Sequence, residues 1–241
     1  SKTVPVKSAP APAAEGLTHQ WTEIDVQSKV LSVKRNHLPK HACLIAMFGP
    51  ARQGKSSVLN LLAERDGVFL ISNKEHSCTK GTWFSPVVNF TSVQGPAISA
   101  TLIDHEGQGD MGPEHDLKLV LPALLFATSI IFNWKAGTQR AKILDELQLF
   151  AKAAAEIAPE DGTKPFGHLT LLMRDKDSKV DADSDDDDDD AASMETAEQV
   201  KQIVFGQEDD ESEDAQQRNQ MRLELYDAFT DIHVHTLPIP C

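Results

Sequence analysis

Apolar residues follow two alternating patterns along the chain, short continuous runs and longer segments with helical spacing. The continuous runs have the length of buried strands. The segments between them repeat apolar side chains every three or four positions, as amphipathic helices do. The strand segments are 42–48, which is continuously apolar, and the apolar-rich 98–103, 129–132, 168–173 and 232–237; the helical segments are 55–63, 113–128, 138–158 and 216–229. Strands this apolar, alternating with helices, predict a three-layer α/β/α fold with a mainly parallel central sheet.

The composition fits one large domain. With 241 residues and 40% hydrophobic content, the chain can cover both faces of one sheet. No segment approaches the roughly 20 consecutive apolar residues of a membrane span. Residues 1–17 lack the apolar core of a signal peptide, so we expect a disordered leader, a folded domain over 18–241 and a cytoplasmic location. The three cysteines, Cys43, Cys78 and Cys241, show no ligand or disulfide spacing and predict reduced thiols.

The formal net charge of −14 comes from one segment. Between Asp175 and Asp214 there are 18 acidic residues and three basic ones, whereas the rest of the chain carries 19 acidic and 20 basic residues. The run 183–190 cannot bury apolar surface, which predicts a disordered acidic insertion over about 176–194. The acidic run also lacks the glycine turn and closing glutamate of a calcium loop. Its charge argues against nucleic acid as a partner of that face.

The first chemical motif directly follows the first apolar run. Residues 49–56 read Gly-Pro-Ala-Arg-Gln-Gly-Lys-Ser, a Gly-x4-Gly-Lys-Ser phosphate loop between an apolar strand and a helix. Glycines let backbone N–H groups converge on phosphates, and the helix N-terminus adds a favourable dipole. Lys55 would reach the β- and γ-phosphates, and the Ser56 hydroxyl would ligate Mg²⁺. The motif therefore predicts a nucleoside triphosphate site.

Two more strand ends carry carboxylates at the same edge of the predicted sheet. Asp104 begins the segment Asp-His-Glu-Gly, where a nucleotide-binding domain holds the water shell of Mg²⁺. Gly107 is the residue type whose N–H can approach a γ-phosphate closely. Asp175, after Arg174, could accept hydrogen bonds from N1–H and N2–H of guanine, whereas adenine presents the wrong edge. The Asn-Lys-x-Asp guanine motif of small GTPases is absent here. Arg-Asp is short, so on its own it is a weak signal for guanine binding.

Taken together, four segments resemble the guanylate-binding-protein branch of the dynamin-like large GTPases, a family that also contains the atlastins. Residues 49–56 are similar to the family's Gly-x-x-Arg-x-Gly-Lys-Ser, and 77–83 to its first switch, Ser-x-Thr-Lys-Gly-x-Trp. Residues 104–110, Asp-His-Glu-Gly-Gln-Gly-Asp, are similar to its Asp-Thr-Glu-Gly-Leu-Gly-Asp. Residues 174–175 match its Arg-Asp guanine motif. The Glu in the second switch favours guanylate-binding proteins over atlastins, which carry Gln there.

The resemblance implies a role for each matching residue. Arg52 would be an internal arginine finger, Ser77 would help orient the attacking water, and Glu106 would hold that water through a water chain. Thr79 would complete the Mg²⁺ shell together with Ser56 and Asp104. The residues expected to bind the nucleotide are Arg52, Gln53, Gly54, Lys55, Ser56, Ser57, Gly107, Arg174 and Asp175. The family also implies a nucleotide-dependent homodimer through the nucleotide face.

Two residues depart from the family pattern, and one histidine pair lies outside it. His105 replaces the family Thr and is interpreted as a packing or loop residue rather than a base. Gln108 replaces the family Leu, at the position where small GTPases of the Ras type carry their water-orienting glutamine, and is a candidate catalytic residue. His233 and His235 lie on one face of a strand and suggest a metal pair. No third ligand is evident in the sequence, so exposed strand histidines are the favoured interpretation.

These observations predict a Mg²⁺-dependent GTPase that binds GTP and GDP and couples hydrolysis to dimerisation. Two alternatives stay open: a guanine-nucleotide-binding regulatory module that hydrolyses poorly, and an ATP-using P-loop enzyme. The large members of the family continue into a helical stalk, which we expect to be absent from this chain. Membrane contact would then come only through missing or separate segments.

Overall fold

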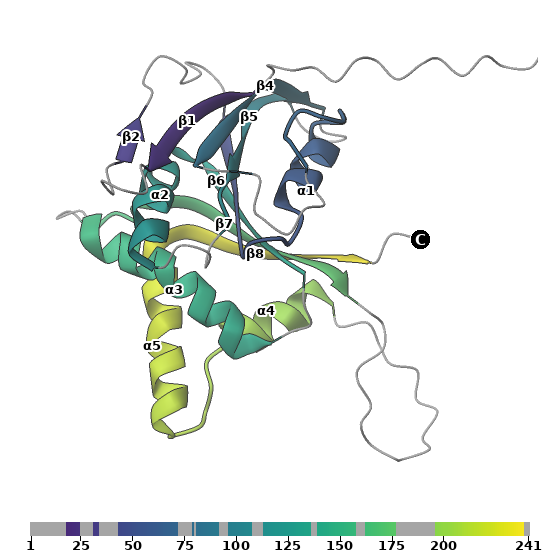
Figure 1. Cartoon of the computed structure of the whole chain (residues 1–241). Coiled ribbons are helices and arrows are strands. Elements are labelled where there is room, and N and C mark those ends of the chain that lie inside the picture. Colours follow the sequence, from purple (N-terminus) through teal and green to yellow (C-terminus); the bar gives the residue numbers. More distant parts are fainter. Residues whose placement is uncertain are drawn as a thin grey trace, which may run out of the picture.

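The computed structural model describes residues 18–24, 31–33, 43–71, 79, 81–91, 96–107, 113–135, 139–157, 162–176 and 196–238 (Figure 1). The predicted leader, and the predicted acidic insertion from residue 177 onward, lie outside these residues. The elements in chain order are β1 (His19–Ile24), β2 (Leu31–Val33), β3 (Cys43–Phe48), α1 (Lys55–Leu62), β4 (Thr82–Phe90), β5 (Ile98–His105), α2 (Pro113–Phe126), β6 (Ser129–Trp134), α3 (Arg140–Ile157), β7 (Phe166–Lys176), α4 (Ala197–Phe205), α5 (Glu213–Ala228) and β8 (Phe229–Pro238).

The described strands form one sheet in the order β2-β1-β4-β5-β3-β6-β7-β8. The five strands from β5 to β8 pair in parallel, while β2, β1 and β4 continue the sheet in antiparallel fashion. The predicted α/β fold with a mainly parallel sheet is therefore confirmed. β3, which leads into the phosphate loop, lies between β5 and β6 in the interior of the sheet. The carboxyl ends of β3, β5, β6 and β7 consequently meet at one edge.

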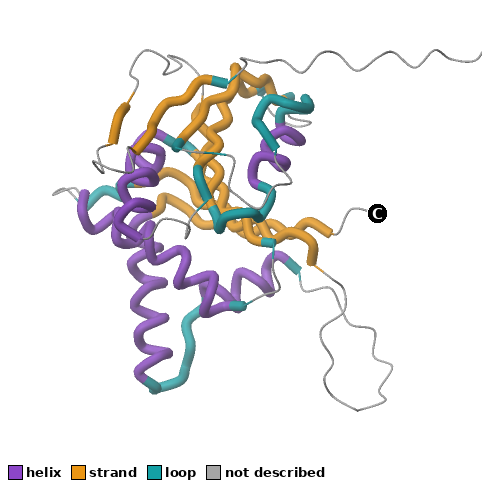
Figure 2. The backbone as a smooth tube through the Cα atoms, in the orientation of Figure 1, coloured by secondary structure: helices purple, strands orange, loops and turns teal. Residues whose placement is uncertain are grey.

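Helices lie on both sides of the sheet (Figure 2). One core joins α2, α3, α4 and α5 to the sheet and contains the aromatic side chains of Phe48, Phe132 and Phe150. The opposite core is smaller and is built by α1, whose Leu59 packs with Met47 of β3. Among the described helices, none is long and apolar enough to cross a membrane.

The second half of the acid-rich stretch is folded. Thr196 caps α4 with a capping box, in which its hydroxyl accepts the N–H of Gln199 and its own N–H donates to the Gln199 side chain. Ser212 caps α5 by accepting the N–H of Ala215 at 3.3 Å. Apolar residues of α4 enter the main core. High acidic content therefore does not prevent folding in residues 196–214.

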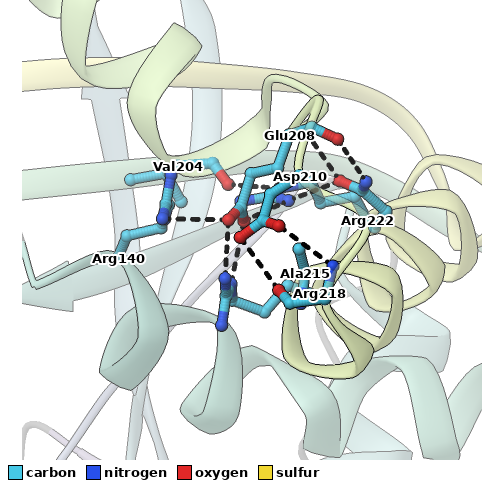
Figure 3. A network of polar contacts seen from close by, with 9 residues as sticks. Arg140, Val204, Glu208, Asp210, Ala215, Arg218 and Arg222 are labelled. Carbon is cyan, nitrogen blue, oxygen red and sulfur yellow. Dashed lines mark hydrogen bonds and ion pairs between the residues drawn. The ribbon is translucent and has the colours of Figure 1, made fainter.

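Three arginines bind the single carboxylate of Glu208 in the connection between α4 and α5 (Figure 3). Arg218 donates to both oxygens, at 2.8 and 2.6 Å, as a bidentate pair. Arg222 lies 2.8 Å from one oxygen, and Arg140, at the start of α3, lies 2.9 Å from the other. The cluster therefore ties α3 and α5 to the loop that separates α4 from α5.

Candidate nucleotide-binding site

The phosphate loop connects β3 to α1 through unusual backbone conformations. Gly49 has φ 130° and Gly54 has φ 69°, so both lie in the region that favours glycine. Arg52 also has a positive φ, 62°, and this conformation costs a residue with a side chain about 1–2 kcal/mol. The Arg52 side chain is exposed. Strain of this kind persists where the surroundings fix it and is common at ligand sites.

Lys55 lies inside the curve of this loop. Its side chain is buried, and Nζ donates to the carbonyl oxygens of Gly49 and Pro50 at 3.0 Å each. The ammonium group is thus held at the base of the loop that the sequence predicts to bind phosphate. Ser56, the next residue, directs its hydroxyl towards the end of β5.

Three oxygen groups that the sequence assigns to a metal converge beside Lys55. The Ser56 hydroxyl donates to Asp104 Oδ2 at 2.7 Å, and the Thr79 hydroxyl donates to the same oxygen at 3.1 Å. The two hydroxyl oxygens are 3.5 Å apart. Asp104 is 2% exposed, and among the described residues its Oδ1 has no hydrogen-bond partner. Two hydroxyls and a carboxylate form an all-oxygen donor set, which suits Mg²⁺.

Burial determines the ionisation of Asp104. Loss of solvation raises its pKa, and the hydrogen bond from Ser56 and the charge of Lys55 oppose this shift. A divalent cation among these oxygens would lower the pKa of Asp104, as the charge of Lys55 does, and would so favour the ionised carboxylate. The residues present therefore fit the metal that the motif implies.

Glu106 connects the two switch segments. Its N–H donates to the Gly81 carbonyl at 2.9 Å, and its Oε2 accepts the Gly81 N–H at 2.7 Å. On the other side, Oε1 lies 3.7 Å from Nε2 of His115 on α2. The sequence did not indicate His115, since nothing in its helical segment distinguishes it from an ordinary helix residue. Glu106 is thus fixed by two hydrogen bonds to Gly81, and Gly107, the next residue, packs against Ala51 of the phosphate loop.

Gly107 follows Glu106 and packs against the phosphate loop. A Cβ at Gly107 would lie 2.4 Å from Cα and 2.7 Å from Cβ of Ala51. Only a residue without a side chain fits this close approach to Ala51. The predicted approach of the Gly107 N–H to a γ-phosphate stays a prediction.

His105 is a buried packing residue, in agreement with its interpretation from the sequence. It is 1% exposed, and its ring centroid lies 4.7 Å from that of Phe48. Burial lowers its pKa to about 4, so the ring is neutral near pH 7. The neutral ring donates through Nδ1 to the Glu106 carbonyl at 2.8 Å, because a carbonyl can only accept.

Asn133 and Arg174 hold the phosphate loop from the neighbouring strand ends. Asn133, at the end of β6, is fully buried and donates from Nδ2 to the Gln53 carbonyl at 2.9 Å. Arg174, near the end of β7, donates to Asn133 Oδ1 at 2.6 Å and also to the Gln53 carbonyl. The Gln53 side chain accepts the N–H of Lys135 at 2.9 Å. The sequence predicted Arg174 as a nucleotide-binding residue, a role that stays a prediction. It missed Asn133, whose signal is a polar residue directly after the apolar segment 129–132.

The remaining predicted site residues are only partly placed. Ser57 is an exposed residue in the first turn of α1, and Asp175 is a residue of β7, next to Arg174. Ser77 and Gln108 lie outside the described residues. Their predicted roles stay predictions.

The fold and the loop together define a P-loop nucleotide-binding domain of the α/β class. The family model described as guanylate-binding protein, N-terminal domain, matches residues 22–241, and the chain therefore belongs to this family.

The curated relatives are distant and much longer. Human guanylate-binding protein 4 is 27% identical over 150 residues, covering 61% of this chain and 23% of that protein. Mouse guanylate-binding protein 6 is 28% identical over 127 residues, covering 52% and 20%. Mouse guanylate-binding protein 3 is 32% identical over 107 residues, covering 43% and 17%. The matched part of this chain thus corresponds to about a fifth of the length of these relatives.

Proposed function

We propose that this domain binds GTP and hydrolyses it to GDP and phosphate in a Mg²⁺-dependent reaction. The observation that carries the proposal is the convergence of Ser56, Thr79 and Asp104 beside the buried ammonium group of Lys55. Mg²⁺, when bound, neutralises charge on the β- and γ-phosphate oxygens. In this chain the two hydroxyls and the carboxylate are the residues that would hold it. Family membership supports the guanine nucleotide as ligand.

In this proposal the phosphate loop binds the triphosphate, and Asn133 and Arg174 hold the loop in place. Backbone N–H groups of residues 52–56 and the start of α1 would surround the phosphates, with Lys55 supplying the positive charge. Asn133 and Arg174 fix the Gln53 carbonyl, which keeps the loop in one conformation before the ligand arrives. Such preorganisation lowers the entropy loss on binding. Asp175, next to Arg174, is the residue that we assign to recognition of guanine.

Catalysis requires stabilisation of the charge that develops on the transferred phosphoryl group. We assign this task to Arg52, because it lies in the loop and its exposed side chain is able to turn towards the phosphate. Arginine fingers contribute about 10³–10⁵ in rate. Glu106 is fixed by its hydrogen bonds to Gly81, and we assign it to the hydrogen-bonded network of the attacking water, together with Ser77. Gln108 is a further candidate for orienting that water.

Dimerisation through the nucleotide face is part of the proposal. It rests on the family and on the exposure of Arg52, which a partner surface would cover and orient. The cytoplasmic location expected from the sequence is likewise a proposal.

The proposed hydrolysis is tested with Arg52→Ala and a matched control, Arg65→Ala, which removes an exposed arginine beyond the other end of α1. We expect Arg52→Ala to lower GTP turnover at least about 100-fold with little effect on GDP affinity, and Arg65→Ala to leave both unchanged. Equal turnover by the two variants would remove Arg52 from the mechanism. Binding without turnover in the unmodified protein would favour the regulatory-module alternative.

The role of Gln108 has its own comparison. If Gln108→Ala lowers turnover as Arg52→Ala does, Gln108 takes part in catalysis. If Gln108→Ala leaves turnover intact while Arg52→Ala abolishes it, the hypothesis for Gln108 is wrong.

A further inference from the structure

Two histidines and an aspartate gather on one face of the sheet, far along β7 and β8 from the nucleotide site. β7 and β8 pair in parallel, with His168 opposite Asp231 and Thr170 opposite His233. The alternate residues of both strands enter the main core under α3 and α5. Because successive side chains of a strand point to opposite faces, these three side chains lie on the other face, where they are exposed.

The three side chains are close enough to share one ion. One nitrogen or oxygen ligand atom from each lies within 4.8 Å of the others. His233 Nε2 is 3.0 Å from Asp231 Oδ2, and the ring centroids of His168 and His233 are 6.4 Å apart. Asp231 Oδ1 accepts the N–H of Ile232 at 2.8 Å, so this bond fixes the carboxylate and leaves Oδ2 directed at the imidazoles.

The chemistry of this group suits a transition metal better than Mg²⁺. Two imidazoles and one carboxylate are ligands that Zn²⁺ prefers, at about 2.0–2.2 Å from the metal. Tetrahedral ligands at such distances are about 3.3–3.6 Å apart. Exposed side chains can close from 4.8 Å to this separation by small rotations.

We propose that His168, Asp231 and His233 form a surface site for a divalent transition-metal ion, with Zn²⁺ as its representative and the fourth position open to water. The sequence pattern pairs His233 with His235, but in the sheet the ring of His233 lies near that of His168 on the neighbouring strand, one diagonal position away. The site lies towards the starts of β7 and β8, whereas the nucleotide site lies at the carboxyl ends of the strands. An ion there links β8, the last strand of the sheet, to β7, and it stabilises the fold because the ligands meet only when the strands are paired.

The test measures Zn²⁺ binding to tag-free protein by competition with a chromophoric chelator, with Mg²⁺ and GDP saturating the nucleotide site. The unmodified protein should bind one equivalent of Zn²⁺. His168→Ala and His233→Ala should each weaken binding at least about tenfold, since even outer-shell changes cost about 10–100-fold. The matched control is His235→Ala, which removes an exposed histidine from the same face of β8. It should leave Zn²⁺ affinity unchanged.

Thermal unfolding gives a second readout. Zn²⁺ should raise the melting temperature of the unmodified protein and of His235→Ala, but not that of His168→Ala. Failure of the unmodified protein to bind Zn²⁺ at 100 μM would overturn the proposal. An equal loss in His235→Ala would overturn the ligand set. GDP affinity, measured on the same samples, reports on the nucleotide site separately.

Discussion

Replacing Glu208 by Gln removes the carboxylate that the three arginines share, while keeping the size of the side chain. The side chain of Glu208 is 9% exposed, and that of Arg222 is 1% exposed. The hydrogen bonds from Arg218, followed by those from Arg222, lower the pKa of Glu208 from 4.5 to about 2. A shift of this size corresponds to about 3 kcal/mol at neutral pH. Solvent screening at the two more exposed arginines reduces it, so we expect Glu208→Gln to lower the free energy of unfolding by about 2 kcal/mol.

The loss of the charge also leaves Arg222 buried beside other cations. Arg222 keeps its hydrogen bonds to the Val204 carbonyl at 2.9 Å and to Asn219 at 2.7 Å, but these acceptors are neutral. Breaking a fully buried pair commonly costs about 3–5 kcal/mol, which sets the upper limit for this variant. Arg140→Ala is the control: its side chain is 39% exposed, and we expect a loss below about 1 kcal/mol.

The pH dependence follows from the direction of the shift. The folded-state pKa of Glu208 lies below its unfolded value, so its stabilisation is complete above about pH 4.5 and is lost as the pH falls towards about 2. Urea unfolding followed by circular dichroism should therefore show a gap between wild type and Glu208→Gln at pH 7 that shrinks by more than half at pH 3. A gap below 0.5 kcal/mol at pH 7, or one that does not change with pH, would refute this reasoning.

Three other variants test the environment of the phosphate loop. Gly107→Ala places a methyl group 2.4 Å from Ala51 Cα, so we expect at least about a tenfold loss of affinity for a fluorescent GDP analogue; unchanged affinity would contradict the contact. Arg52→Gly should be about 1 kcal/mol more stable than Arg52→Ala in urea, because only glycine relieves the positive φ; equal stability would argue against the strain. Burial lowers the pKa of His105 to about 4, below the value in the unfolded chain. The unfolded state therefore binds the proton more tightly, and the free energy of unfolding should fall by up to about 3 kcal/mol as the pH drops from about 6.5 to 4. In His105→Thr the free energy of unfolding should depend much less on pH between about 6.5 and 4. An unchanged pH dependence in this variant would contradict the prediction.

Most strands of the parallel part of the sheet could be predicted because their residues are largely apolar and face a buried core on at least one side. β3, β5, β6, β7 and β8 appear in the sequence as apolar-rich segments of strand length, and the structure extends several of them by one to three residues at an end. β1, β2 and β4 were missed since they lie towards one edge, where polar residues alternate with apolar ones and where β4 contains Pro86. α4 was missed for another reason, because it lies inside the acid-rich stretch, whose composition hides a nine-residue helix with a capping box.

Site residues that belong to a sequence motif could be predicted. Site residues that come together only through the pairing of strands could not. Ser56, Thr79 and Asp104 were assigned to one metal from three separate motifs, and the structure brings their oxygens together. Asn133 belongs to no motif, and its contact with Gln53 depends on the pairing of β3 with β6. The partnership of His168 with His233 likewise depends on the register of β7 and β8, which the sequence does not express.

The most direct test of the proposed function is phosphate release measured with GTP and ATP side by side, each with Mg²⁺ and with the metal removed by chelation. We expect turnover of GTP with Mg²⁺, at least about 100-fold less turnover of ATP, and almost none of either nucleotide without the metal. Asp104→Asn should lose turnover with Mg²⁺ present, because it removes the carboxylate that orders the two hydroxyls. Equal turnover of ATP and GTP would contradict the guanine assignment, and turnover of neither nucleotide would contradict the assignment as a GTPase.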